Sequence, residues 1–166
     1  MEGKVVWSWG MILIILIILI MAKGDRLYFQ ASKEIKKNKP NKRKVFLLLE
    51  RAASYQNPKA SYALATWFLH GELVKKDFNK AFELLKIAAS ENMPAAFYDL
   101  AVYFETGKGT KKDTKNAFEN YLKASLLGDK QSIYEVGRCY CYRIGVGKNL
   151  QLSKIWLDAA KFWKVS

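Results

Sequence analysis

The chain has 166 residues, a length that suits about one domain. Its hydrophobic content of 51% and aromatic content of 14% supply a packed core, so the composition excludes a chain that is disordered throughout. The net charge is +13, and residues 23–51 hold ten basic and three acidic side chains, so more than half of the positive excess lies in one segment.

The first predicted element is the uncharged apolar run at residues 5–22. As a helix, its 18 residues would span about 27 Å, close to the hydrocarbon thickness of a bilayer, so residues 1–22 are predicted to form a single transmembrane anchor. Only Lys4 precedes the run, whereas many basic residues follow it, which favours a cytoplasmic C-terminal domain. The alternative is a secretory signal cleaved near Gly24, which predicts an exported or periplasmic protein.

Residues 23–43 are predicted to form a basic juxtamembrane linker. Gly24 and Asp25 are expected to loosen or break the helix, residues 27–37 to form a short amphipathic helix, and Pro40 to stop it. The cations of residues 23–44 are expected to contact anionic lipid headgroups. Because the segment carries no interleaved aromatic pattern and no reading motif, no nucleic-acid partner is predicted.

From residue 44 to the C-terminus at 166, the chain repeats with a period of 36 residues. A half repeat at residues 44–57 precedes three fuller repeats at 58–93, 94–129 and 130–165, which align without gaps. Each fuller repeat reads as a helix, a glycine-bearing loop and a second helix. No such unit can bury its apolar face alone, so the period predicts an all-α solenoid in which neighbouring units complete the core.

The step of 36 residues predicts which side chains make the helices pack. In the first helices it relates large residues to small ones one turn away, which favours close helix approach. These columns are Tyr62, Tyr98 and Tyr134; Leu64, Leu100 and Val136; Ala65, Ala101 and Gly137; and Phe68, Phe104 and Tyr140. In the second helices the predicted N-caps are Asp77, Asp113 and Asn149, and the predicted close-packing residues are Ala52, Ala88, Ala124 and Ala160.

These residues resemble the Sel-one-like repeat (SLR) family, 36-residue relatives of tetratricopeptide repeats. The resemblance covers residues 44–165 and is carried by the first-helix columns, the Gly107-Lys-Gly109 and Gly145-Val146 loops, and Trp156. It implies a right-handed solenoid of paired helices that binds other proteins. Two positions depart from the pattern, because Leu73 and Arg143 replace loop glycines, and we expect altered geometry or strain there.

By analogy with tetratricopeptide-like arrays, the first helices line the concave face and bind peptides. Tyrosine and arginine are favoured at binding hot spots, although a tyrosine column can equally pack between helices. The predicted binding residues on this face are Tyr62, Thr66, His70, Tyr98, Val102, Tyr134, Arg138 and Tyr142.

Catalysis is the less favoured hypothesis. His70 is the single histidine and has no evident nucleophile beside it, and Cys139 and Cys141 point to different sides of one helix. Some relatives with paired cysteines have been linked to β-lactams, but this chain lacks those pairs and any Ser-x-x-Lys motif. No catalytic residue, cofactor or metal site is therefore predicted.

The sequence thus predicts a membrane-anchored scaffold or adaptor for other proteins, with an exported envelope protein as the alternative. A second interaction is predicted at the C-terminal helix, where Ile155, Trp156, Phe162 and Trp163 form an apolar end. This end is expected to be covered by a partner, by the membrane or by another copy through self-association.

Overall fold

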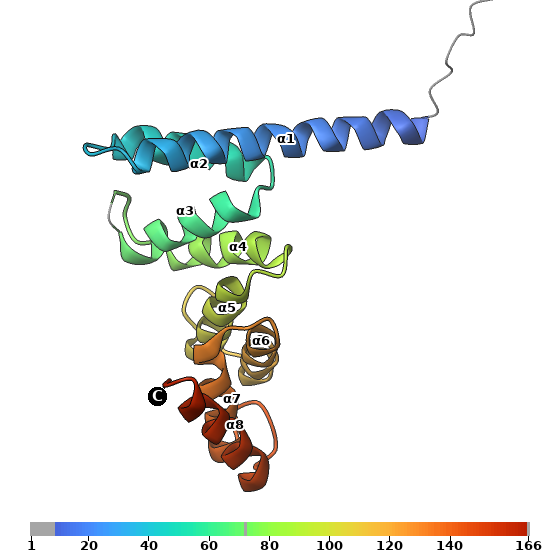
Figure 1. The fold of residues 1–166 in the computed structure, drawn as a ribbon, viewed down its shortest axis with the longest axis vertical. Coiled ribbons are helices and arrows are strands. Elements are labelled where there is room, and N and C mark those ends of the chain that lie inside the picture. Colours follow the sequence, from blue (N-terminus) through green and yellow to red (C-terminus); the bar gives the residue numbers. More distant parts are fainter. Residues whose placement is uncertain (1–8, 72, 166) are drawn as a thin grey trace, which may run out of the picture.

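The structure, a computed structural model, describes residues 9–71 and 73–165 of the chain. Within these residues it is entirely helical, as the repeat pattern predicts (Figure 1). Its eight helices are α1 (Trp9–Ile35), α2 (Lys42–Ser54), α3 (Pro58–His70), α4 (Phe78–Ala89), α5 (Pro94–Thr106), α6 (Thr114–Leu126), α7 (Lys130–Tyr142) and α8 (Leu150–Phe162).

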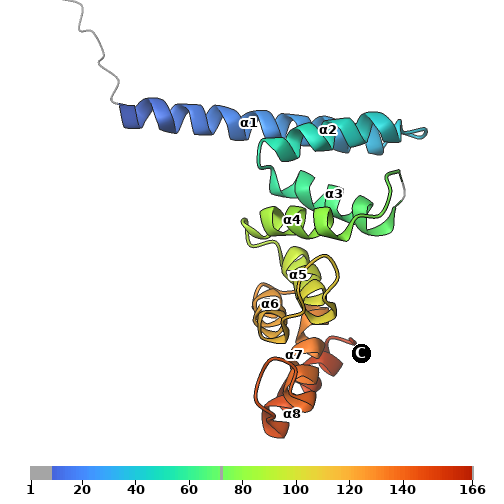
Figure 2. The same ribbon diagram turned by 180° about the vertical axis from the view of Figure 1, so that it is seen from behind.

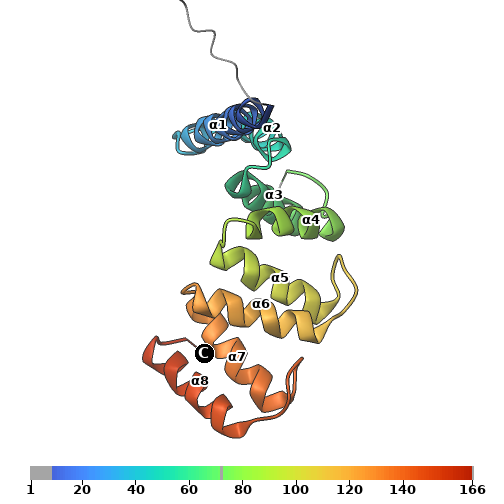
Figure 3. The same cartoon turned by 90° about the vertical axis from the view of Figure 1, so that its right-hand side faces the viewer.

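The helices pack as four pairs, α1–α2, α3–α4, α5–α6 and α7–α8, and each pair contacts the next through α2–α3, α4–α5 and α6–α7. The pairs stack along the long axis of the molecule, and the stack twists: α3 and α4 lie across the view in Figure 1, whereas α5 and α6 lie across it in Figure 3. This nearest-neighbour arrangement confirms the predicted solenoid.

The second helices begin at side-chain caps spaced by 36 residues. Asp77, Asp113 and Asn149 each accept a hydrogen bond from the backbone N–H three residues later, at 2.9, 3.0 and 2.9 Å, which confirms the predicted caps. Asn41 does the same for α2, accepting from the Lys44 N–H at 3.0 Å. The cap column therefore extends one repeat further toward the N-terminus than predicted.

The predicted helix break at Gly24 and Asp25 is wrong, because α1 is continuous from Trp9 to Ile35. Gly24 is buried where α1 crosses the end of α2, and a Cβ there would lie 3.1 Å from the Tyr55 Cβ. Asp25 accepts a hydrogen bond from Asn57 Nδ2 at 2.7 Å. The glycine thus permits close approach of two backbones. The second half of α1, within the predicted linker, supplies the first helix that the half repeat lacked.

An aromatic ladder, Phe46, Phe82 and Phe118, connects successive pairs at intervals of 36 residues. The Phe46 ring stacks on Trp67 with centroids 5.7 Å apart, Phe82 meets the Phe104 ring edge-on at 5.3 Å, and Phe118 meets Tyr140 edge-on at 5.4 Å. Each ladder ring belongs to a second helix, and each partner belongs to the first helix of the next pair. The corresponding position in α8 is Lys154.

Small residues let the helices of each pair approach closely, as predicted. Ala52, Ala88 and Ala124 are completely buried, and Ala160 is almost so. Helices α7 and α8 also approach closely at Gly137, where an added Cβ would lie 2.8 Å from the Leu157 Cγ. The Ser153 hydroxyl donates to the Gly137 carbonyl at 2.8 Å and fixes α8 against α7.

The loop glycines pack against the preceding repeat. A Cβ on Gly109 would lie 2.2 Å from the Phe78 carbonyl oxygen, so no side chain fits where this loop crosses the start of α4. Arg143 replaces the first loop glycine of the third repeat yet keeps the left-handed conformation, with φ 61°. The expected strain at Arg143 is therefore present, since L-residues rarely adopt this conformation.

The predicted membrane span is only partly within the described residues, because residues 5–8 lie outside them. The described part of the apolar run, residues 9–22, would extend about 21 Å as a helix. Among the helices of residues 9–71 and 73–165, none combines the length and apolar character that a bilayer crossing requires.

Candidate functional site

All eight predicted binding residues lie on the first helices of the last three pairs. Tyr62, Thr66 and His70 are on α3, Tyr98 and Val102 on α5, and Tyr134, Arg138 and Tyr142 on α7. His70 and Tyr142 are exposed, and the other six are partly buried. Tyr142 is the most accessible aromatic residue of the set, with 72% of its surface exposed.

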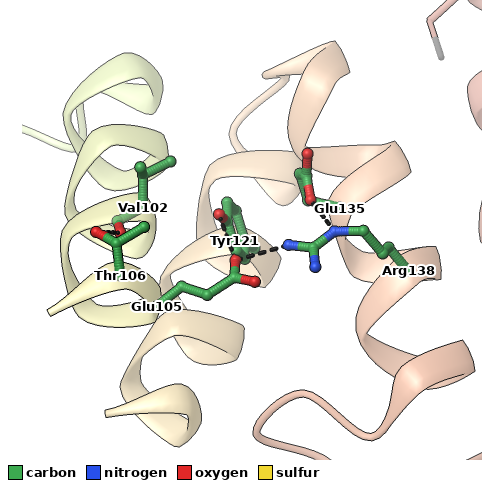
Figure 4. Close-up of polar contacts among 6 residues, drawn as sticks. All are labelled: Val102, Glu105, Thr106, Tyr121, Glu135 and Arg138. Carbon is green, nitrogen blue, oxygen red and sulfur yellow. Dashed lines mark hydrogen bonds and ion pairs between the residues drawn. The ribbon is translucent and has the colours of Figure 1, made fainter. Parts of the chain in front are cut away.

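Arg138 joins two neighbouring first helices through carboxylates (Figure 4). Its Nη2 lies 2.6 Å from Glu105 Oε2 on α5, and its Nε lies 2.5 Å from Glu135 Oε2 on α7. The Tyr121 hydroxyl of α6 donates to the same Glu105 oxygen at 2.9 Å. The guanidinium predicted to contact peptide is therefore engaged inside the array.

The charges of this network reinforce one another. Burial opposes ionisation of Glu105, but the hydrogen bonds from Arg138 and Tyr121 outweigh it and hold the pKa of the carboxyl below its usual range. The two carboxylates raise the pKa of Arg138 despite its burial. Burial and the neighbouring Glu105 raise the pKa of Tyr121, so its phenol remains a donor. The network thus fixes α5, α6 and α7 in one arrangement.

Asp99 forms a second polar centre on α5. Its carboxylate interacts with the Tyr62 hydroxyl of α3, so each group alters the protonation of the other across neighbouring pairs. The pKa of Asp99 is raised to about 6, chiefly by burial and also by the nearby Asp129, although Tyr62 acts to lower it. Burial and Asp99 raise the pKa of Tyr62 to about 12. Tyr62 therefore connects two repeats rather than standing free.

The tyrosine column divides into packing and accessible members. The Tyr98 ring meets Tyr121 edge-on with centroids 5.8 Å apart, and burial raises the pKa of Tyr98. With Tyr62 facing Asp99, the first two members of the column contribute to helix packing. The accessible aromatic side chain of the predicted set is therefore Tyr142 on α7.

The predicted binding set does not include Asp99, Glu105, Glu135 or Tyr121, which organise the polar contacts of this face. Two signals could have found them. Helix α5 carries two carboxylates and no basic residue in a chain that is otherwise strongly basic. In addition, Glu105 and Arg138 are 33 residues apart, which is one repeat less about one helical turn and places them on adjacent first helices.

The cysteines and His70 do not form a reactive cluster. Cys139 is completely buried, and burial raises the pKa of its thiol to about 12, so little reactive thiolate forms at neutral pH. Cys141 is partly exposed on the same helix, and His70 lies at the end of α3. In the described part of the chain, no group of three or more His, Cys, Asp or Glu side chains is arranged to hold a metal ion.

Comparison with known families identifies the same repeat three times in succession along the chain. The model of the Sel1 repeat matches residues 58–93, 94–129 and 130–161, which together are more than half of the chain. The chain belongs to the Sel1 repeat family. The resemblance predicted from the first-helix columns and loop glycines is thereby confirmed. No curated protein sequence matches the chain significantly.

Solved structures place the Sel1 array among proteins of the same fold. The protective antigen c5321 of uropathogenic Escherichia coli, which has an SLR fold, superposes over 89% of this chain with a TM-score of 0.77 and 21% identity. A Sel1 repeat protein from Oxalobacter formigenes gives a TM-score of 0.61 with 29% identity over 69% of this chain and 86% of its own.

A third structure, cysteine rich protein B of Helicobacter pylori, gives a TM-score of 0.58 with 25% identity over 75% of this chain and 95% of its own. The chain spans only 33% of the Escherichia coli antigen. The likeness to that antigen therefore concerns the fold alone.

Proposed function

We propose that this Sel1 protein is a scaffold that binds other proteins through its first helices and is held at a membrane by residues 5–22. Sel1 repeats generally mediate protein–protein interactions, which supports the scaffold role. The exposed apolar residues of α1 support the attachment, since side chains from Met11 to Met21 are 40–60% exposed.

The scaffold proposal rests on a difference in exposure: the second helices supply packing residues, whereas the first helix α7 presents accessible aromatic side chains. The second helices contribute the aromatic ladder and the buried alanines that hold the array together. The first helix α7 instead presents Tyr142, and its neighbour Tyr134 is partly exposed. Aromatic side chains on a rigid surface are favoured contacts for a protein partner.

Site-specific photo-cross-linking in cells tests the binding face. A photoreactive amino acid at Tyr134 or Tyr142 should yield a discrete cross-linked protein, whereas the same residue at Glu83 or Glu119, on exposed positions of second helices, should not. Loss of the product after Tyr134→Ala in the Tyr142-labelled protein would tie it to this face. Equal labelling from both sets of positions would overturn the assignment of the face.

Membrane attachment and sidedness are tested separately. The full chain should remain with membranes after alkaline carbonate extraction, whereas a variant with three of the isoleucines at 12–18 replaced by serine should be released. A C-terminal alkaline phosphatase fusion should be inactive, and a fluorescent protein fusion active, if the array is cytoplasmic. The opposite pattern would favour the exported alternative.

A further inference from the structure

Helix α1 has one half that packs in the array and one half that projects from it. Its second half is built into the first pair, where Gly24, Leu27 and Ala31 are buried. Its first half, residues 9–22, projects beyond α2 to one side of the stack in both Figure 1 and Figure 2. Since the helix is uninterrupted, the direction of the projecting half is fixed relative to the array.

Three contacts stiffen the point at which α1 leaves the array. A Cβ on Gly24 would lie 3.1 Å from the Tyr55 Cβ and 3.3 Å from the Asn57 Cβ, so a larger residue would have to displace these neighbours. Asn57 Nδ2 donates to Asp25 Oδ1 at 2.7 Å, and Lys23 Nζ lies 4.9 Å from the centre of the Tyr55 ring. Both Tyr55 and Asn57 lie at the turn between α2 and α3. The turn therefore holds the helix, and α1 has no flexible joint there.

The direction of α1 determines which side of the array lies nearest to the medium that the projecting half of α1 enters. The α2–α3 turn and the α4–α5 turn lie on the side toward which α1 projects, whereas the loops within the first two pairs lie on the opposite side (Figures 1 and 2). A groove of about 390 Å³ separates α1 from these turns and is lined by Ile17, Ile20, Met21, Tyr55, Gln56, Pro58, Ser90 and Glu91.

The charges along this edge are mixed. Lys23 and Arg26 are exposed on α1 immediately after the apolar run, and Asp25 is exposed between them, while Glu91 lines the groove. Basic residues that follow an apolar helix lie at the level of lipid headgroups. The occupant is therefore indicated by the direction of the apolar half of α1, which brings the two turns to the lipid surface with Lys23 and Arg26 at headgroup level.

We infer that the α2–α3 and α4–α5 turns form a lipid-facing edge, so that the array lies along the membrane in one fixed orientation. The inference rests on the proposed membrane attachment and adds a contact surface to it. The apolar half of α1 enters the hydrocarbon, and the groove receives lipid at the interface. The loops at residues 36–41 and 73–77 point away into water, so the headgroup contact predicted for residues 23–44 narrows to Lys23 and Arg26.

Nitroxide labels on matched positions test this edge in the full chain. Ser54 and Ser90 end α2 and α4 at the proposed edge and are one repeat apart, and Lys39 and Lys75 are their matched controls in the opposite loops. Single cysteines would replace each of them in a Cys139→Ala, Cys141→Ser background, reconstituted in vesicles of phosphatidylcholine with phosphatidylglycerol. Collision rates with oxygen, which concentrates in lipid, and with a nickel chelate, which stays in water, report the depth of each label.

The ratio of oxygen to nickel collisions should be several-fold higher at positions 54 and 90 than at 39 and 75. Insertion of Gly-Ser-Gly-Ser-Gly between Ala22 and Lys23 should keep the chain on the vesicles but remove the difference. Attachment with equal ratios at all four positions would overturn this inference and leave the proposed attachment standing. Failure of the unmodified chain to attach to vesicles would overturn both.

Discussion

Gly137 determines how closely the last two helices approach. The corresponding first-helix positions are Ala65 and Ala101, so only the third repeat omits the methyl group. The missing atom makes room for the Leu157 side chain and brings the Gly137 carbonyl to the Ser153 hydroxyl. The replacement of a methyl group by a hydrogen atom at position 137 therefore sets how closely α7 and α8 pack.

Replacing Gly137 with alanine should lower the free energy of unfolding by about 1–3 kcal/mol, because the added Cβ overpacks against Leu157. Urea unfolding of the full chain in mild detergent, followed by circular dichroism, measures the change. Gly147→Ala is the matched control, since a Cβ there meets no atom within 4 Å, and it should be neutral or stabilising by about 0.4–1 kcal/mol. Equal effects of the two substitutions would contradict this account.

Asp99 makes stability depend on pH in the direction opposite to most carboxylates. Its pKa is raised from 3.8 to about 6, so the folded chain binds this proton more tightly than the unfolded chain. The contribution of Asp99 to the free energy of unfolding should therefore be most favourable below about pH 4 and fall as the pH rises through about 6.

Asp99→Asn removes this titration while keeping an acceptor for the Tyr62 hydroxyl. The variant should be more stable than the wild type at pH 8 by about 1–3 kcal/mol, and the difference should shrink toward pH 4. Urea midpoints measured across this range test the prediction. Asp158→Asn, on exposed α8, is the control. A stability difference that does not change with pH would show that Asp99 acts through packing instead.

At the scale of the helices, the aromatic ladder is the main apolar link between pairs. Phe82 belongs to α4, yet its ring contacts Tyr103 and Phe104 of α5. Around it the Glu105–Arg138 and Tyr62–Asp99 contacts add polar links between the first helices. The second and third junctions between pairs are thus held by apolar contacts from the second helix and by polar contacts on the first-helix face.

Phe82→Ala should lower the free energy of unfolding by about 3–5 kcal/mol, because it leaves a cavity at the α4–α5 junction. Phe162→Ala removes the same side chain from a site that is 77% exposed and should change the free energy by less than about 0.5 kcal/mol. Chemical unfolding of both variants provides the comparison. A small loss for Phe82→Ala would mean that the pairs are coupled chiefly by polar contacts.

At the scale of the whole molecule, burial is uneven along the stack. Helix α8 buries only Ser153 and Ala160 among its residues, whereas α6 buries five side chains, including Phe118 and Tyr121. In an array whose units contact only their neighbours, local opening depends on these nearest contacts. Amide hydrogens of α8 should therefore exchange faster than those of α6, which hydrogen-exchange mass spectrometry measures. Equal protection would mean that the last pair opens only with the array.

The sequence was sufficient for the architecture, because the 36-residue step is a property of the packing itself. Caps such as Asp77 and close contacts such as Ala88 follow directly from their register. It was not sufficient at Gly24, where composition alone cannot separate a helix break from a close backbone approach. The predicted face failed to identify Asp99 for a similar reason: its role depends on burial against a neighbouring repeat.

The predicted apolar C-terminal end also needed the structure. Ile155 and Phe162 are exposed, but the ladder position that would face a following pair is Lys154. The number of hydrophobic residues in a helix does not reveal the side on which each of them lies. The position of each residue relative to the ladder does reveal it. The self-association predicted at this helix therefore remains a proposal, and it would involve the outer side of α8 rather than its ladder position.

The ladder also determines how the length of this protein can change. Every junction presents a phenylalanine from one repeat to an aromatic residue one repeat later, so the junctions are interchangeable. A duplicate of residues 94–129 placed after Asp129 would bring Phe118 to a second copy of Phe104, the partner that Phe82 already has. Gains or losses of whole repeats keep a phenylalanine opposite an aromatic residue at every junction, whereas other lengths shift the ladder out of register. Gene duplication can therefore lengthen this array while it retains aromatic contacts between all pairs.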